Sequence, residues 1–103
     1  MKSTPEYHPL ARLDLIESAA FYDEAEEELG DRFLAEAEAI LSRLPKKAFH
    51  FRIRFEDIRR VNLPSFQHGI FYFIHQDCII VLGILHGARD TEKELANRRE
   101  RWV

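Results

Sequence analysis

Two apolar runs in the second half of the chain restrict its fold more than any other feature. Residues 70–74 (IFYFI) and 79–85 (IIVLGIL) are apolar at nearly every position, which is typical of central strands that are buried on both faces. Gln76 and Asp77, which lie between the two runs, predict a two-residue hairpin turn. The rest of the chain must therefore extend a sheet around this hairpin and cover its faces.

Two segments upstream carry the period of amphipathic helices. Residues 10–29 place apolar side chains on one stripe, and Gly30 predicts the end of that helix at a left-handed residue. Residues 31–44 repeat the pattern, with Asp31 as the predicted N-cap and Pro45 as the predicted stop. Because the connection is so short, the two helices are expected to lie antiparallel as a hairpin.

The period changes to that of strands after the second helix. Residues 49–55 alternate apolar and basic side chains and indicate an edge strand or an extended loop, and residues 58–63 predict a further strand. Near the end of the chain, Thr91 and Glu94 match a capping box, so we expect a C-terminal helix that runs through Arg101.

These elements predict one α+β domain over residues 1–103, with an N-terminal helical hairpin packed on a small antiparallel β-sheet and a C-terminal helix. A length of 103 residues allows one domain, and a hydrophobic content of 46% can fill its core. A single cysteine, Cys78, fits a reducing compartment. No run approaches the roughly 20 apolar residues of a membrane span. We therefore expect a cytoplasmic protein with no membrane partner.

Counting back from the hairpin turn predicts which residues lie opposite one another. The count places His68 opposite Leu85, and His86 opposite Gln67 on the other face of the sheet. His86 and Arg89 would then gather with the start of the C-terminal helix at one end of the hairpin.

Charge is segregated along the chain, although the formal net charge is only −3. Residues 14–38 hold ten acidic side chains and one basic one, whereas residues 43–60 hold seven basic and two acidic ones. Arg59 and Arg60 are neighbours on a predicted strand and point to opposite faces, so only one of them can join the cluster around His86. The net charge argues against a general nucleic-acid binder. The segregation indicates either ordinary solvated surfaces or a polarised surface that attracts an anionic partner.

Residue types that would indicate a metal, a cofactor or a nucleophile lack the necessary spacing. The five histidines show no ligand pattern, the four glycines form no phosphate loop, and Cys78 has no recognisable base beside it. We therefore expect no metal and no cofactor. The remaining candidate is the polar cluster at residues 86–90 (HGARD), directly after the last strand. The alternative is that Arg89 pairs with a helix acid and His86 is an ordinary strand-end residue.

Six stretches of the sequence resemble the RelE/ParE superfamily of type II toxins, and more specifically its ParE-like, plasmid-stabilisation branch. They occur in the family's order over about residues 7–98, and are YHPLA running into DL, AAFY, LGDRF, IRRV, GIFY and ILHGARD. The resemblance implies the same α+β fold and a growth-arresting toxin without a cofactor. It also implies a cognate antitoxin that silences the toxin within a toxin–antitoxin hetero-oligomer.

The superfamily contains two activities, and the residues favour one of them. The ribonuclease branch, which cleaves mRNA on the ribosome without a metal, tends to place an arginine where Gly69 stands and a late tyrosine near Leu95. These departures favour the other branch, which inhibits DNA gyrase. Arg89 matches an arginine that both branches share, and His86 and Arg89 are the catalytic candidates if the chain is a ribonuclease. A third alternative is an inactive scaffold that binds only the antitoxin.

The resemblance and the charge pattern together give a set of candidate contact residues. An amphipathic antitoxin segment with acidic side chains is expected to lie across the basic half and cover Arg59 or Arg60. Trp102 is either a core plug or an exposed partner anchor. The candidates for binding the target or the antitoxin are Arg59, Arg60, His86, Arg89, Arg98 and Trp102.

Overall fold

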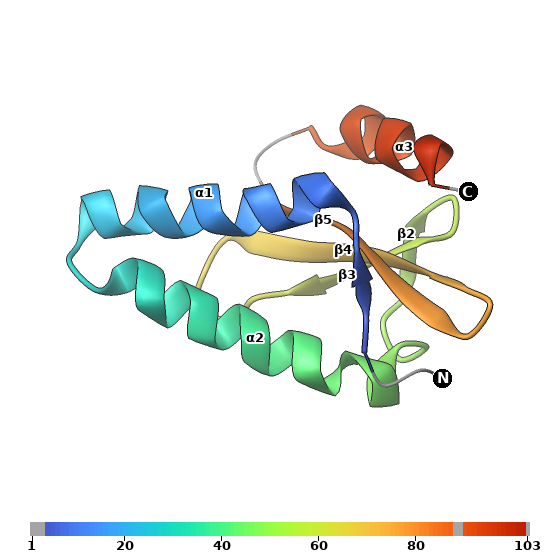
Figure 1. Ribbon diagram of the computed structural model, residues 1–103, viewed down its shortest axis with the longest axis horizontal. Coiled ribbons are helices and arrows are strands. Elements are labelled where there is room, and N and C mark those ends of the chain that lie inside the picture. The colour runs from blue at the N-terminus through green and yellow to red at the C-terminus, as the bar shows by residue number, and fades with distance from the viewer. Residues whose placement is uncertain (1–3, 88–89, 103) are drawn as a thin grey trace.

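The computed structural model describes residues 4–87 and 90–102 of the chain (Figure 1). Within these residues, the elements in chain order are β1 (Glu6–Tyr7), α1 (Pro9–Ala25), α2 (Leu29–Lys47), β2 (Ile53–Phe55), β3 (Ile58–Asn62), β4 (His68–His75), β5 (Cys78–His86) and α3 (Glu92–Arg101). None of these helices is both long and apolar enough to cross a membrane.

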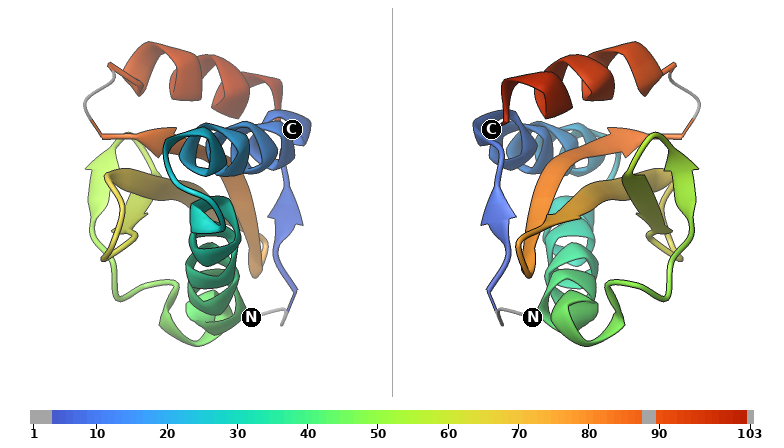
Figure 2. Two further views of the ribbon diagram at one scale, coloured as in Figure 1. Left: turned by 90° about the vertical axis from the view of Figure 1, so that its left-hand side faces the viewer. Right: turned by 90° about the vertical axis from the view of Figure 1, so that its right-hand side faces the viewer.

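The described strands form one sheet in the order β1-β5-β4-β3-β2. Strands β2 to β5 pair antiparallel, as predicted, whereas β1 runs parallel to β5, so the sheet is mixed. Figures 1 and 2 show α1 and α2 side by side as a hairpin, with α1 between α2 and α3. The predicted α+β fold, with its helical hairpin and C-terminal helix, is confirmed.

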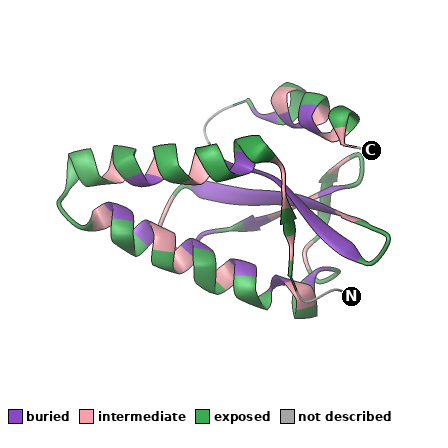
Figure 3. Cartoon of the chain, in the orientation of Figure 1, coloured by how far each residue is buried: buried purple, intermediate pink, exposed green. Residues whose placement is uncertain are grey.

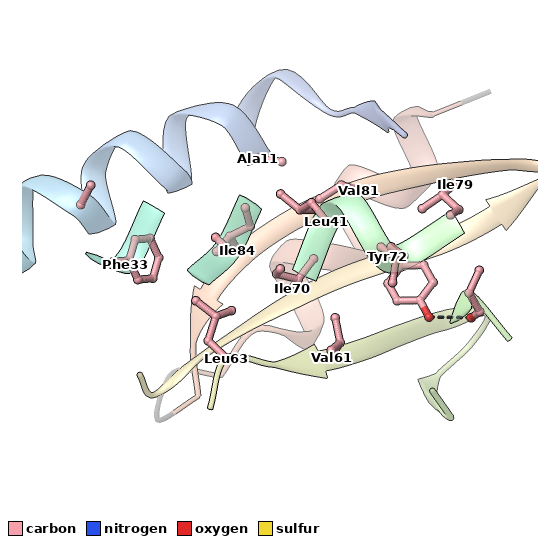
Figure 4. Close-up of a cluster of buried hydrophobic side chains, with 14 residues drawn as sticks. Ala11, Phe33, Leu41, Val61, Leu63, Ile70, Tyr72, Ile79, Val81 and Ile84 are labelled. Carbon is pink, nitrogen blue, oxygen red and sulfur yellow. Dashed lines mark hydrogen bonds between the residues drawn. The ribbon is translucent and has the colours of Figure 1, made fainter. Parts of the chain in front are cut away.

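Two apolar clusters lie on opposite faces of the sheet. The larger one joins both helices of the hairpin to the sheet (Figure 4), and includes Ala11, Phe33, Leu41, Val61, Ile70, Tyr72 and Val81. At its edge the Tyr72 hydroxyl donates to the Ala48 carbonyl at 2.6 Å, and burial raises the pKa of Tyr72 to about 12. The smaller cluster lies under α3 and contains Ile58, Phe71, Phe73, Ile80, Leu82 and Leu95. Burial is accordingly concentrated along β4 and β5 (Figure 3).

The central hairpin follows the predicted register near its turn and departs from it farther away. Gln76 and Asp77 both take positive φ, at 49° and 60°, which is the conformation of a type I′ hairpin turn. A bulge then shifts the pairing between Phe71 and Tyr72, so that His68 lies opposite His86. The predicted pairing of His68 with Leu85 is therefore wrong. Because one extra residue exchanges the faces of everything beyond it, the bulge brings His68 and His86 to the same face.

The connection between α1 and α2 differs from the prediction. α1 ends at Ala25, Glu28 takes the left-handed conformation with a φ of 68°, and Gly30 lies inside α2 without a positive φ. Asp31 is therefore not the N-cap. Gly30 is instead the point of closest approach between the helices, because a Cβ there would collide with the Ala19 carbonyl.

Other predicted boundaries are wrong by a few residues. α2 continues through Pro45 to Lys47, because the buried side chains of Leu44 and Ala48 hold its last turn against the core. Residues 49–55, which predict an edge strand or an extended loop, form a strand only at Ile53–Phe55. Thr91 precedes α3, but its side chain makes no capping bond, and its carbonyl accepts from the Leu95 N–H at 2.9 Å.

Candidate functional site

The end of the β4–β5 hairpin farthest from its turn gathers several of the predicted residues. His68 and His86 lie there with ring centroids 5.2 Å apart. The Gly87 N–H donates to the Gln67 carbonyl at 2.6 Å, which fixes the backbone just after β5. Arg89 lies outside the described residues, so the structure does not place it against His86.

His68 is a buried polar link between α1 and β4. Its Nε2 lies 3.1 Å from the Ser18 hydroxyl, and its Nδ1 lies 3.0 Å from the Tyr22 hydroxyl. The Tyr22 and Phe33 rings pack against the imidazole, which is 6% exposed. Burial, and then the neighbouring His86, lower the pKa of His68 to about 4. The imidazole is therefore neutral near pH 7, and both of its nitrogens are occupied by protein hydroxyls.

His86 borders an open cavity of about 320 Å³ beside α1, which Asp14, Ser18 and Phe21 also line. The side chain is half-buried and is closer to solvent than His68. Phe21 is 62% exposed at the same rim. The residues that line the cavity include carboxylates, hydroxyls and an imidazole, so the cavity is not lined by charges of one sign.

Arg59 and Arg60 point to opposite faces of the sheet, as the strand period predicts. Arg59 lies on the face of the helical hairpin, where its Nη1 donates to the Phe51 carbonyl at 2.6 Å. Arg60 lies on the other face, over the Phe71 ring at 5.2 Å, and its Nε donates to Asn62 Oδ1 at 2.6 Å. A Cβ added at Gly87 would lie 2.9 Å from Arg60 Nη2, so Arg60 reaches the end of the hairpin.

Arg98 is an interior cation that fixes α3 to the sheet. It is 6% exposed, and its Nη1 donates to Asp14 Oδ2 at 2.7 Å and to the Leu82 carbonyl at 2.9 Å. Asp14 Oδ2 also accepts from the Ile84 N–H at 3.1 Å, just past the bulge. Gly83 makes room for this pair, because a Cβ there would lie 2.7 Å from Arg98 Nη1. Little of the surface of Arg98 is therefore open to a target or an antitoxin.

Arg99 and Trp102 complete the attachment of α3. The guanidinium of Arg99 lies 3.8 Å from the centroid of the Phe73 ring, and its Nη2 pairs with Asp57 at 2.9 Å. The half-buried Trp102 packs against the cluster under α3, and its ring centroid lies 6.4 Å from that of His8. Trp102 thus presents part of its ring to the core and part to solvent.

Sequence reasoning missed three residues that organise this region. His68 was predicted to lie opposite Leu85 instead of His86, because nothing in the apolar sequence of β5 indicates the bulge. Asp14 is one of ten acidic residues at positions 14–38 and has no distinguishing spacing. Asn62 orients Arg60 through a hydrogen bond. The sequence could have indicated this contact, because residues two positions apart on a strand lie on the same face. Across residues 4–87 and 90–102, no group of three His, Cys, Asp or Glu side chains could hold a metal ion.

Comparison with known proteins finds a matching family model and ten matching chains among solved structures. Residues 6–91 match the family model described as "ParE toxin of type II toxin-antitoxin system, parDE". A solved structure described as the chromosomal ParDE TA system from P. aeruginosa matches with a TM-score of 0.73 and 14% identity, and covers 81% of this chain and 94% of that chain. At this identity the structural match shows the fold. No curated protein matches the chain.

Proposed function

Because the chain belongs to the ParE toxin family of type II toxin–antitoxin systems, we propose that it arrests growth by inhibiting DNA gyrase until a cognate antitoxin binds it. The observation that carries this proposal is the family match across residues 6–91, which includes the central hairpin and most of the candidate site. The toxin would act in the cytoplasm and form a hetero-oligomer with its antitoxin.

One position in the fold supports inhibition by contact in preference to RNA cleavage. Cleavage requires a base that can take the proton of the 2′-hydroxyl. Both nitrogens of His68 already contact the hydroxyls of Ser18 and Tyr22, so the candidate base at this end of the hairpin is His86, which borders the open cavity. Leu95, near which the resemblance places the late tyrosine of ribonucleases, is fully buried under α3. Gyrase inhibition needs neither group, because it depends on surface contacts.

The antitoxin is proposed to cover the side of the molecule formed by β2 and the segment before it. There Phe49 is 67% exposed and Ile53 is 48% exposed, and the exposed Arg52 and Arg54 lie beside them. β2 is the edge of the sheet, so its outer backbone groups can pair with a further strand. An amphipathic segment with acidic side chains would satisfy both the apolar and the charged groups.

The proposal is tested by adding the purified protein, free of antitoxin, to gyrase and relaxed plasmid DNA. We expect supercoiling to fall and cleaved gyrase–DNA complexes to accumulate. Arg89→Ala is expected to relieve inhibition while antitoxin binding is retained, and Arg43→Ala, on the exposed surface of α2, serves as the matched control. Unchanged supercoiling, together with codon-specific mRNA cuts in a translating extract, would contradict gyrase inhibition. Normal growth of cells that express the toxin alone would indicate an inactive scaffold.

A further inference from the structure

A second cavity at the end of the hairpin lies beside Arg60 and differs in charge from the cavity beside His86. It has a volume of about 470 Å³, and its lining residues are Arg60, Asn62, Leu63, Pro64, Phe66, Gln67, His68 and Gly87. No carboxylate is among its lining residues within the described part of the chain. The cavity therefore offers hydrogen-bond donors and positive charge without an internal anion.

The guanidinium of Arg60 is held in place beside this cavity. Its Nε is bound to Asn62 Oδ1, and its flat face lies over the Phe71 ring. A Cβ at Gly69 or at Gly87 would collide with the Arg60 side chain, so the guanidinium can take this position only because both residues are glycines. Preorganisation of this kind lowers the entropy lost when an anion binds.

The positive charge of Arg60 is not neutralised within residues 4–87 and 90–102. No ion pair of Arg60 is present there, and its Nη groups donate to no protein acceptor. Burial, and then the nearby charge of Arg54, lower the pKa of Arg60. The side chain remains charged near pH 7, because an arginine pKa lies far above that pH. An external anion would stabilise it.

We propose that Arg60, Asn62 and Gln67 form a subsite for a phosphodiester group of a nucleic-acid strand. A phosphodiester suits this donor set because its oxygens accept hydrogen bonds from a guanidinium and from side-chain amides. The apolar surfaces of Pro64 and Phe66 would lie against the sugar. The exposed Arg52 and Arg54 extend the positive charge toward neighbouring phosphates.

This subsite rests on the proposed function, under which the strand is the DNA that gyrase holds. The net charge of −3 disfavours capture of free nucleic acid. The subsite is therefore expected to bind weakly alone and to act on a strand that another protein presents.

The test measures binding of the full chain to a fluorescent single-stranded DNA 12-mer over a range of salt concentrations, without gyrase. Arg60→Ala is expected to weaken binding about tenfold and to reduce the salt slope by about 0.7, which corresponds to one lost phosphate contact. Arg43→Ala is the matched control, because that side chain lies on the exposed surface of α2, away from this cavity, and the affinity of the variant should stay within about twofold of the parent. Arg60→Lys should recover most of the salt slope, and circular dichroism checks that each variant is folded.

Several outcomes decide between the subsite and its alternatives. Equal losses of affinity in Arg43→Ala and Arg60→Ala, or no binding of the parent protein to DNA or RNA, would overturn the subsite. Displacement of the DNA by polyglutamate at equal charge would also overturn it, because the cavity would then prefer the carboxylates of an antitoxin. Selective binding of an RNA 12-mer through Arg60 would support the phosphate subsite and count against gyrase. Loss of gyrase inhibition in Arg60→Ala, with DNA binding unchanged, would overturn the subsite but leave the proposed function standing.

Discussion

On one face of the sheet, α1 and α2 bury a continuous apolar cluster that includes Phe33, Leu41 and Tyr72. On the other face, the ten-residue α3 adds Leu95 and is otherwise attached through Arg98, Arg99 and the half-buried Trp102. Apolar packing is insensitive to pH and only mildly sensitive to salt, whereas ion pairs depend on the protonation and pairing of both partners. The comparison teaches that the hairpin face is the stable half of the molecule and that α3 is the element whose attachment can be weakened selectively.

The largest effect is expected from breaking the buried pair beneath α3. Asp14→Asn removes the charge that balances Arg98, which is 6% exposed, so we expect the free energy of unfolding to fall by about 3 kcal/mol. Urea denaturation measures this loss. Hydrogen exchange should show that the amides of α3 lose more protection than those of α2.

The matched control for Asp14 is Glu17→Gln, one turn farther along α1 and exposed. That change should alter stability by less than about 0.5 kcal/mol, as is usual for surface substitutions. Equal loss of protection in α2 and α3 would show that the two faces unfold as one unit, and the comparison above would then be wrong.

On the face covered by the helical hairpin, His68 forms a polar contact with Ser18 and Tyr22. Protonation of His68 provides a second test of the comparison between the two faces. The pKa of His68 is about 4 in the fold, against an ordinary value of 6.5, so the fold favours the neutral imidazole. The unfolded chain consequently binds more protons between these pH values. The stabilising contribution of His68 is complete above pH 6.5 and is lost as the pH falls to about 4, with a magnitude on the order of 2 kcal/mol.

The measurement for His68 compares the pH dependence of stability with that of His68→Gln. The amide of glutamine can still bond to Ser18 and Tyr22 but does not titrate in this range, so its profile should be flatter between pH 6.5 and 4. Other titrating groups are common to both proteins and cancel in the difference. Parallel profiles would mean that solvent already reaches the imidazole, and that this face is less tightly closed than its burial indicates.

The sequence predicted the parts of the fold that periodicity and turn chemistry determine. Residues 76–77 predicted the hairpin turn, and the apolar stripes predicted the two antiparallel helices; the structure contains both. The bulge near Leu82 could not be predicted, because a run that is apolar on both faces has no alternation to reveal a shift in register. The candidate site depends on that bulge, so the pairing of His68 with His86 was out of reach. The attachment of α3 was also hidden, since the partners Asp14 and Arg98 are 84 residues apart in the chain.

The smallest effect is expected at the outer end of α3. The pair of Arg99 with Asp57 is partly exposed to water, and the guanidinium also lies on the Phe73 ring. Arg99→Ala should therefore lower stability by about 1 kcal/mol, most of it from the lost contact with the ring. Arg99→Lys separates the two contributions, because a lysine keeps the charge but cannot present a flat face to the ring.

Denaturation at 0.1 M and 1 M salt measures how much of the loss in stability is ionic. If salt abolished most of the difference between the parent and Arg99→Ala, the outer end of α3 would be held by charge alone, and the contrast between the two faces would be sharper than the packing of Phe73 suggests.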